Sequence, residues 1–180
     1  MENYKKNLVL LTKNHVYSKE MEHDACGVGL IASTEGKKSR AIVEYGIEAL
    51  KAVWHRGAVD ADGKTGDGAG IHVEIPKDFF IEKIQVTGHD YDNSEICVGM
   101  IFLPRNDYSA QENCKTIVES ELTKNNFSIY GWRQVPVNPK ILGEKALQTM
   151  PEITQVLFKS NDPNLLDKNL ERKIYEIRKR

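Results

Sequence analysis

Cysteine is scarce in this 180-residue sequence, and its three copies lie far apart. They are Cys26, Cys97 and Cys114, and they form neither a CxxC nor a CxxxC pair. This spacing argues against a zinc knot or an iron–sulfur cluster held by this chain alone. The odd number argues against a framework of disulfides. The five histidines never pair at the spacing that places two ligands on one helix face, so the sequence predicts no metal site.

The sequence also lacks an excess of charge and long apolar runs. The formal net charge is −1, which gives no electrostatic reason to expect a nucleic-acid or acidic-membrane partner. The longest early apolar run is Leu8-Val9-Leu10-Leu11. It is too short for the core of a signal peptide, and no stretch could span a bilayer. We therefore expect a cytoplasmic protein, or an organellar one if a transit peptide is missing here.

The composition is typical of a soluble globular domain, with 40% hydrophobic and 28% charged residues. A chain of this length suits one domain with a sizeable core. Residues 1–25 show no sustained periodicity. Beyond them, apolar spacing predicts helices at 39–54, 109–122, 141–150 and from 167 onward, with a helical turn at 79–80, and strands at 26–33, 71–75, 95–103, 127–135 and 153–159.

Several of these elements carry more specific predictions. Ser39 is expected to cap the first helix, and Ser109 to Glu112 forms a capping box that opens the second. The strand at 95–103 is apolar on both faces, which is typical of the middle of a covered sheet. Cys97 then belongs to the core. Gly131 marks a bulge or a close approach of two backbones.

The second helix places Cys114 on an apolar stripe with Ile117, Val118 and Leu122. Residues three or four positions apart share one face of a helix. We therefore expect Cys114 to lie in the core, as Cys97 does.

Two stretches stand out for their chemistry. The first, Glu22 to Ala32, brings Cys26 to the head of a short apolar segment rich in small residues. The second, Leu50 to Ala58, contains Arg56 and leads into a glycine-rich run, Thr65 to Gly70. Taken alone, a cysteine beside glycines also fits a small core residue, and an arginine there also fits a charge at a helix C-terminus.

The glycine-rich run does not match known ligand loops in its context. Gly63-Lys64-Thr65 resembles a phosphate loop, but the preceding glycine is one residue too far away and no strand leads in. Asp60 to Gly63 resembles a calcium loop, but its glycine comes too early. Gly66 to Gly70 resembles a dinucleotide turn, but a strand is predicted after it. We interpret Gly66, Asp67 and Gly68 as a tight loop beside a site.

In this order and spacing, the two stretches resemble the start of the glutamine amidotransferase domain of the glutamate synthase family. Gly131 to Val137 and Glu171 to Tyr175 extend the resemblance along the chain. It implies an α+β fold of the N-terminal-nucleophile hydrolase type, a four-layer α/β/β/α sandwich that is incomplete at the C-terminus. Residues 1–25 are then a leader, and 26–180 the N-terminal portion of a type 2 glutamine amidotransferase domain.

The resemblance also implies roles for Cys26 and Arg56. A thiol attacks an amide only as the thiolate, and no side chain near Cys26 in the sequence is identifiable as its base. Once the leader is removed, the α-amine of Cys26, with a pKa of about 7.7–8, can take the proton. Arg56 is assigned to the glutamine α-carboxylate, which a guanidinium can bind with two parallel hydrogen bonds.

Glutamine and the remaining glutamate synthase domains are the implied partners. Ammonia from glutamine would pass to 2-oxoglutarate in domains absent here, which hold FMN and an iron–sulfur cluster, and this chain would bind no cofactor. The family's oxyanion-hole Asn-Gly pair and its ammonium-binding aspartate are expected beyond Arg180. The chain alone should therefore be poorly active. Two alternatives stay open: an N-terminal-nucleophile amidase of other specificity, and a non-catalytic domain that binds a partner through the glycine-rich loop.

Overall fold

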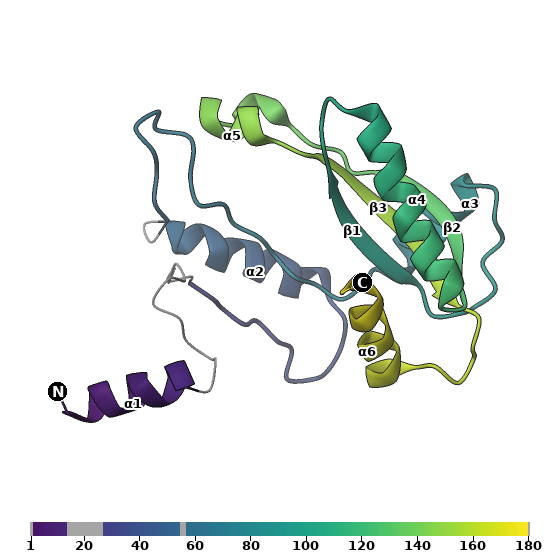
Figure 1. The fold of residues 1–180 in the computed structure, drawn as a ribbon, viewed down its shortest axis with the longest axis horizontal. Helices are drawn as coiled ribbons and strands as arrows, with labels where there is room; N and C mark the ends of the chain where they lie inside the picture. The colour runs from purple at the N-terminus through teal and green to yellow at the C-terminus, as the bar shows by residue number, and fades with distance from the viewer. Residues whose placement is uncertain (1, 14–26, 55–56, 180) are drawn as a thin grey trace. The chain divides into compact units, whose positions relative to one another are not determined.

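The computed structural model describes residues 2–13, 27–54 and 57–179 of the chain. These fall into two compact units, residues 1–56 and residues 57–180, drawn in Figure 1. Cys26 and Arg56, the two residues predicted to act on glutamine, lie outside the described residues.

The described residues of the first unit form the helices α1 (Glu2–Lys13) and α2 (Arg40–Ala52). The helix predicted at 39–54 is confirmed, and the Ser39 hydroxyl accepts a hydrogen bond from the Ala41 backbone N–H at 3.2 Å, as a cap should. α1 lies within the predicted leader, although that segment has no sustained apolar period.

The strand predicted at 26–33 is wrong for residues 27–33, which have no regular structure. Val28 and Leu30 are 93% and 89% exposed. A strand needs a neighbour to bond its backbone groups, and no strand in the described part of the chain pairs with this segment. The strand predicted at 71–75 is absent for the same reason.

The second unit is built on an antiparallel sheet in the order β1-β3-β2. The strands are β1 (Cys97–Leu103), β2 (Phe127–Gln134) and β3 (Glu152–Ser160). β3 is central, and its five consecutive residues 154–158 are all buried. The prediction that 95–103 is a central strand is wrong: β1 is an edge, with Met100 and Phe102 49% and 64% exposed.

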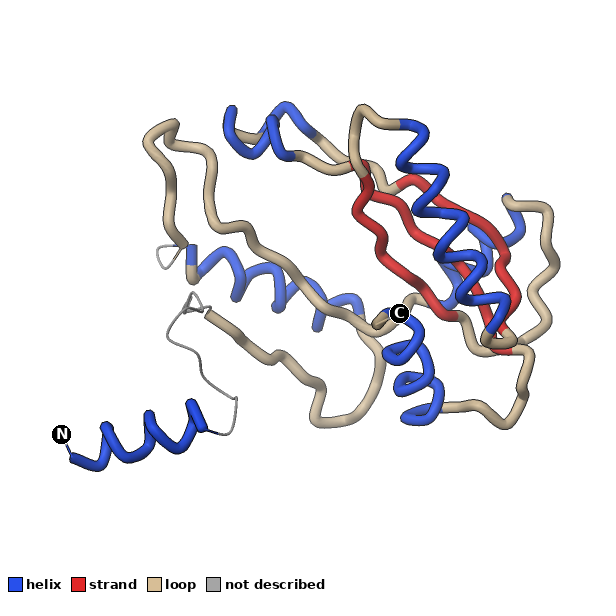
Figure 2. The backbone as a smooth tube through the Cα atoms, viewed as in Figure 1, coloured by secondary structure: helices blue, strands red, loops and turns tan. Residues whose placement is uncertain are grey.

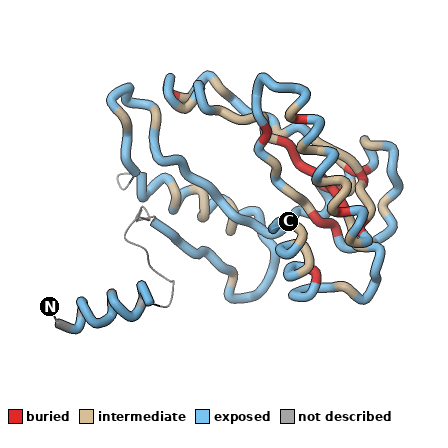
Figure 3. The backbone as a smooth tube through the Cα atoms, in the orientation of Figure 1, coloured by how far each residue is buried: buried red, intermediate tan, exposed pale blue. Residues whose placement is uncertain are grey.

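Helices lie on both faces of this sheet. α4 (Tyr108–Lys124) and α6 (Asp167–Arg178) cover one face, and α3 (Lys77–Val86) packs on the other, as Figure 1 shows. The first face buries Cys97, Leu122, Phe127, Val156, Phe158 and Leu170, and the second buries Phe80, Ile84, Ile96, Tyr130 and Leu157. The buried segments therefore gather at the sheet (Figure 3). Helices packed on an antiparallel sheet confirm the α+β class.

Gly131 lies at a bulge, one of the two features predicted for it. The pairing of β2 with β3 shifts register between Ile129 and Gly131, which is a bulge. The residue has φ +145°, and a Cβ there would lie 2.9 Å from Cγ2 of Thr87, which directly follows α3. The prediction of a bulge is confirmed, whereas the close neighbour of Gly131 is the Thr87 side chain and not a second backbone.

The predicted details of α4 are partly wrong. The helix begins two residues earlier than the capping box requires, and its cap is Asp107 instead of Ser109; Oδ1 of Asp107 accepts from the Ala110 N–H at 2.9 Å. Cys114 is only half-buried and Ile117 is exposed. Gln111 is buried instead, because its amide donates to the Pro104 carbonyl at 2.7 Å. Hydrogen bonding at the start of the helix outweighs apolar spacing there.

A short helical segment connects β2 to β3. It consists of the 3₁₀ turn η2 (Pro139–Ile141) and the helix α5 (Glu144–Thr149), close to the prediction at 141–150. None of the helices in the described residues is long and apolar enough to cross a membrane.

Candidate functional site

The glycine-rich loop after Gly57 folds into a tight hairpin, part of the long irregular connection between α2 and α3 in Figure 2. Val59 pairs with Gly66, and the Asp60 N–H donates to the Thr65 carbonyl at 2.7 Å. Gly63 closes the turn with its N–H on the Asp60 carbonyl at 2.9 Å, and its φ of +68° is one that glycine adopts without strain.

Asp62 is the main hydrogen-bond acceptor of this hairpin. Its Oδ1 accepts from the Lys64 and Thr65 N–H groups at 2.9 and 2.7 Å, and its Oδ2 accepts from the Thr65 hydroxyl at 2.5 Å. Hydrogen bonds to the charged form of an acid favour that form. The Thr65 hydroxyl and the two backbone donors thus lower the pKa of Asp62 to about 2.

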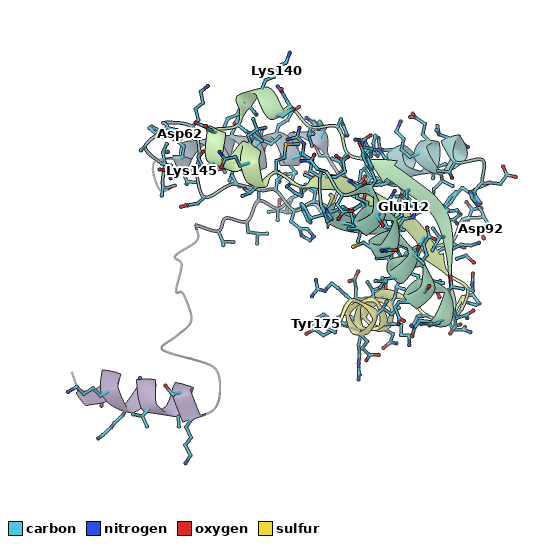
Figure 4. The ribbon with its side chains drawn as sticks, turned by 45° about the horizontal axis from the view of Figure 1, so that its top comes forward. Asp62, Asp92, Glu112, Lys140, Lys145 and Tyr175 are labelled. Carbon is cyan, nitrogen blue, oxygen red and sulfur yellow. The ribbon has the colours of Figure 1, made fainter. Side chains whose placement is uncertain are left out.

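The hairpin is fastened to the start of α5. Oδ2 of Asp62 also accepts from the Glu144 backbone N–H at 3.2 Å, and Lys145 forms an ion pair with Asp60 at 2.5 Å. Figure 4 shows Asp62 and Lys145 at the same corner of the second unit. Gly143 lies so close that a Cβ would be 2.6 Å from the Thr65 nitrogen. Only a residue without a side chain fits at this contact.

The residues predicted to lie beside the site close the base of the hairpin. Asp67 accepts from the Ala58 N–H at 3.1 Å through Oδ2. A Cβ on Gly66 would lie 3.1 Å from the Ala58 carbonyl oxygen, so the two sides of the loop approach closely there. Gly68 has φ +86°. These three residues therefore shape the backbone that directly follows Arg56 in the sequence.

A known protein family matches most of this chain. The family model of class-II glutamine amidotransferases matches residues 26–180 of this sequence. The chain belongs to the class-II glutamine amidotransferases. The match begins at Cys26, the residue that the resemblance identifies as the nucleophile.

Individual relatives of this amidotransferase chain are glutamate synthases. It is 53% identical over 177 residues to the glutamate synthase [NADPH] large chain of Azospirillum brasilense, 38% over 172 residues to the ferredoxin-dependent glutamate synthase of Pyropia yezoensis, and 36% over 181 aligned positions to the glutamate synthase [NADH] of Saccharomyces cerevisiae. These alignments cover 98%, 95% and 95% of the chain, but only 12%, 11% and 8% of the relatives. The chain thus spans an eighth or less of each relative.

Cys97 of this amidotransferase lies in an environment unsuited to a nucleophile. It is buried in the sheet core, and burial, aided by the negative charges of Glu95 and Glu171, raises the pKa of its thiol from 9.0 to about 12. The prediction that Cys97 is a core residue is confirmed. Cys114 on α4 is only half-buried and is not among the residues of the buried core cluster on that face of the sheet, so the prediction that it belongs to the core is wrong.

Sequence reasoning about the amidotransferase missed the contact between Asp62, Thr65 and Gly143. A local signal was available for its first half, because an Asp followed two and three residues later by free backbone N–H groups is typical of an Asx turn. No local signal connects the loop to Glu144, which is 82 residues away.

A second polar cluster lies where β2 and β3 meet the loop after α3. Asp92 forms an ion pair with Lys159 and accepts from the Tyr130 hydroxyl at 3.1 Å. The bond from Lys159 contributes most to lowering the pKa of Asp92, while burial raises the pKa of Tyr130. These groups bond to one another, which is typical of a structural network. Among the residues that the structure describes, no group of three or more His, Cys, Asp or Glu could hold a metal.

Proposed function

We propose that the chain is the N-terminal portion of the amidotransferase domain of a glutamate synthase, and that this domain hydrolyses glutamine to glutamate and ammonia. The observation that carries the proposal is the class-II family match over residues 26–180, which starts at the cysteine expected to act. The 53% identity to a glutamate synthase large chain supports the choice of parent enzyme.

In the proposed mechanism, Cys26 acts with its own α-amine. The amine takes the thiol proton, and the thiolate attacks the side-chain amide carbon of glutamine. Ammonia leaves with a proton returned by the amine, and water then hydrolyses the thioester to glutamate. Because an amine and not an amide nitrogen is needed, residues 1–25 must first be removed.

One relative also aligns with most of the segment proposed as a leader. Residues 26–180 number 155, whereas the relative from Azospirillum brasilense aligns over 177 residues and covers 98% of the chain. That alignment therefore includes much of the segment 1–25.

Arg56 is proposed to bind the glutamine α-carboxylate with its guanidinium, because two parallel hydrogen bonds fix a carboxylate in both position and orientation. The hairpin that begins one residue later has its base closed by Asp67 on Ala58. A hydrogen-bonded segment that close to Arg56 in the sequence would help to fix the orientation of a substrate-binding arginine.

The four-layer sandwich remains part of the proposal. Met100 and Phe102 on β1, and Val28 and Leu30 in the first unit, are large apolar side chains left substantially exposed. A second sheet packed on β1, as the sandwich would have, would remove the apolar surface of Met100 and Phe102 from water.

Ammonia is proposed to pass to 2-oxoglutarate in other domains of the parent enzyme, which would hold the FMN and the iron–sulfur cluster. The cytoplasmic location, the absence of nucleic-acid and membrane partners and the lack of a metal or cofactor in this chain stay predictions.

The test is ammonia release from glutamine by the full-length protein that contains this chain. We expect N-terminal sequencing of active enzyme to begin Cys-Gly-Val-Gly. Cys26→Ser should abolish release, whereas Cys114→Ser should leave it within about twofold, because a half-buried thiol on α4 touches no reacting group. Release from other amides but not glutamine would favour the amidase of other specificity, and no release from any amide would favour a non-catalytic domain. Full activity in protein that still begins at Met1 would refute the α-amine mechanism.

A further inference from the structure

One carboxylate, that of Asp62, bonds to both the glycine-rich hairpin and the start of α5. Asp62 accepts four hydrogen bonds, three from within the hairpin and one from the Glu144 N–H at the start of α5. The side chain is at the surface, so water could replace any of these bonds singly. Four donors converging on two oxygens nevertheless fix the hairpin and the helix in one arrangement.

Two further contacts make this link specific. Lys145 pairs with Asp60 on the other side of the turn. Gly143 leaves room for the Thr65 backbone, where a Cβ would approach to 2.6 Å. The contact thus combines a carboxylate, an ion pair and a position open only to glycine. None of these is required for a surface loop that merely connects α2 to α3.

Further contacts along the hairpin connect its tip to its base. The hydrogen bond from Asp60 to Thr65 and the pairing of Val59 with Gly66 connect the turn to Ala58. The Ala58 backbone N–H donates in turn to the Asp67 carboxylate. Ala58 follows Arg56 by two residues in the sequence. Since consecutive Cα atoms are 3.8 Å apart, the chain itself limits the separation of these two Cα atoms to about 7 Å.

We propose that Asp62 is a positioning residue of the glutamine site, because it fastens the glycine-rich hairpin to α5 and thereby holds the backbone next to Arg56. The proposal rests on the proposed function, in which Arg56 binds the glutamine α-carboxylate. Loss of the Asp62 contacts should weaken recognition of the amino-acid part of glutamine and leave the reactivity of the Cys26 thiol unchanged.

The first experiment tests the fastening without reference to activity. Trypsin can cut after Lys64, at the tip of the hairpin, and the rate is measured in the full-length protein relative to the same bond in a free peptide of residues 58–70. Asp62→Asn and Thr65→Val should each raise this relative rate by about tenfold, because local opening governs cleavage of a folded loop. Thr65→Ser, which keeps the hydroxyl, and Asp90→Asn, an exposed carboxylate elsewhere, should not. Unchanged cleavage in Asp62→Asn would overturn the proposal.

The second experiment tests the positioning role on mature enzyme that begins at Cys26. A diazo-ketone analogue of glutamine and iodoacetamide both alkylate a thiolate, but only the analogue carries the α-carboxylate. For Asp62→Asn and Thr65→Val, we expect the half-saturating concentration of the analogue to rise by about tenfold and the iodoacetamide rate to stay within about twofold. Thr65→Ser should restore analogue binding.

The outcomes of the second experiment separate the two proposals. Equal slowing of both reagents would mean a general structural defect and would overturn the positioning role, as would an unchanged response to the analogue. If the analogue fails to label Cys26 even in the unaltered enzyme, the proposed function is refuted and the positioning role falls with it. The trypsin result would still decide whether Asp62 fastens the hairpin.

Discussion

The three cysteines should differ widely in their rates of alkylation. Cys97 is 5% exposed, and its thiol has a pKa raised from 9.0 to about 12. Only the thiolate reacts, so three pKa units reduce the reactive fraction at pH 8 by about 1000-fold relative to a thiol with the ordinary value. Burial also blocks access of the reagent. We therefore expect Cys97 to react with iodoacetamide at least ~1000-fold more slowly than an unhindered thiol.

The assay uses the fact that trypsin releases the cysteines in separate peptides, residues 20–37, 84–105 and 106–115. The folded chain is exposed briefly to iodoacetamide at pH 8, and the peptides are quantified by mass spectrometry. We expect most label on Cys26, less on the half-buried Cys114, and none on Cys97. In urea all three should react at similar rates, which controls for peptide recovery. Labelling of Cys97 within about tenfold of Cys114 in the folded chain would refute the burial argument.

Three other predictions concern the sheet core, the hairpin and the proposed substrate contact. Leu157→Ala should lower the free energy of unfolding by about 2–5 kcal/mol because the side chain is fully buried, whereas the half-exposed Leu166→Ala should cost less than about 1 kcal/mol. Urea unfolding followed by tryptophan fluorescence should thus show a midpoint lowered by about 1–2 M for Leu157→Ala alone. The Asp62 carboxyl carbon should titrate near pH 2 by NMR. Since its folded pKa is below its unfolded value, the stability it contributes is complete above about pH 4 and is lost as the pH falls through 2; a midpoint near 4 would contradict the hydrogen bonds described for it. In the full-length enzyme, Arg56→Lys should raise the KM for glutamine by about 10–100-fold, from the loss of about 1.5–3 kcal/mol of paired hydrogen bonding, and an unchanged KM would remove Arg56 from the site.

The sequence alone determined those features whose causes are local. The helix capped by Ser39 and the strands around Gly131 and Val156 were predictable because apolar period, cap chemistry and glycine conformation act within a few residues. The resemblance carried by the segments around Cys26 and Arg56 indicated the amidotransferase family, which the match over residues 26–180 confirms. The roles of Cys26 and Arg56 themselves stay predictions.

Tertiary structure decided which of the predicted strands pair with a neighbouring strand. The apolar pattern of residues 95–103 is compatible with the centre or the edge of a sheet, and pairing with β3 placed it at the edge. Residues 27–33 have strand-like composition but remain irregular, because backbone groups form a strand only against a neighbour.

The same distinction separates the predicted part of the candidate site from the part that was missed. The tight loop at Gly66, Asp67 and Gly68 was predictable from composition, since glycine and aspartate are typical of tight turns; its place beside a glutamine site stays a prediction. The role of Asp62 was not, because its bond to the Glu144 N–H joins residues 82 positions apart. Only the packing of the folded chain brings such distant groups together. A pattern read over a few neighbouring residues carries no information about that packing.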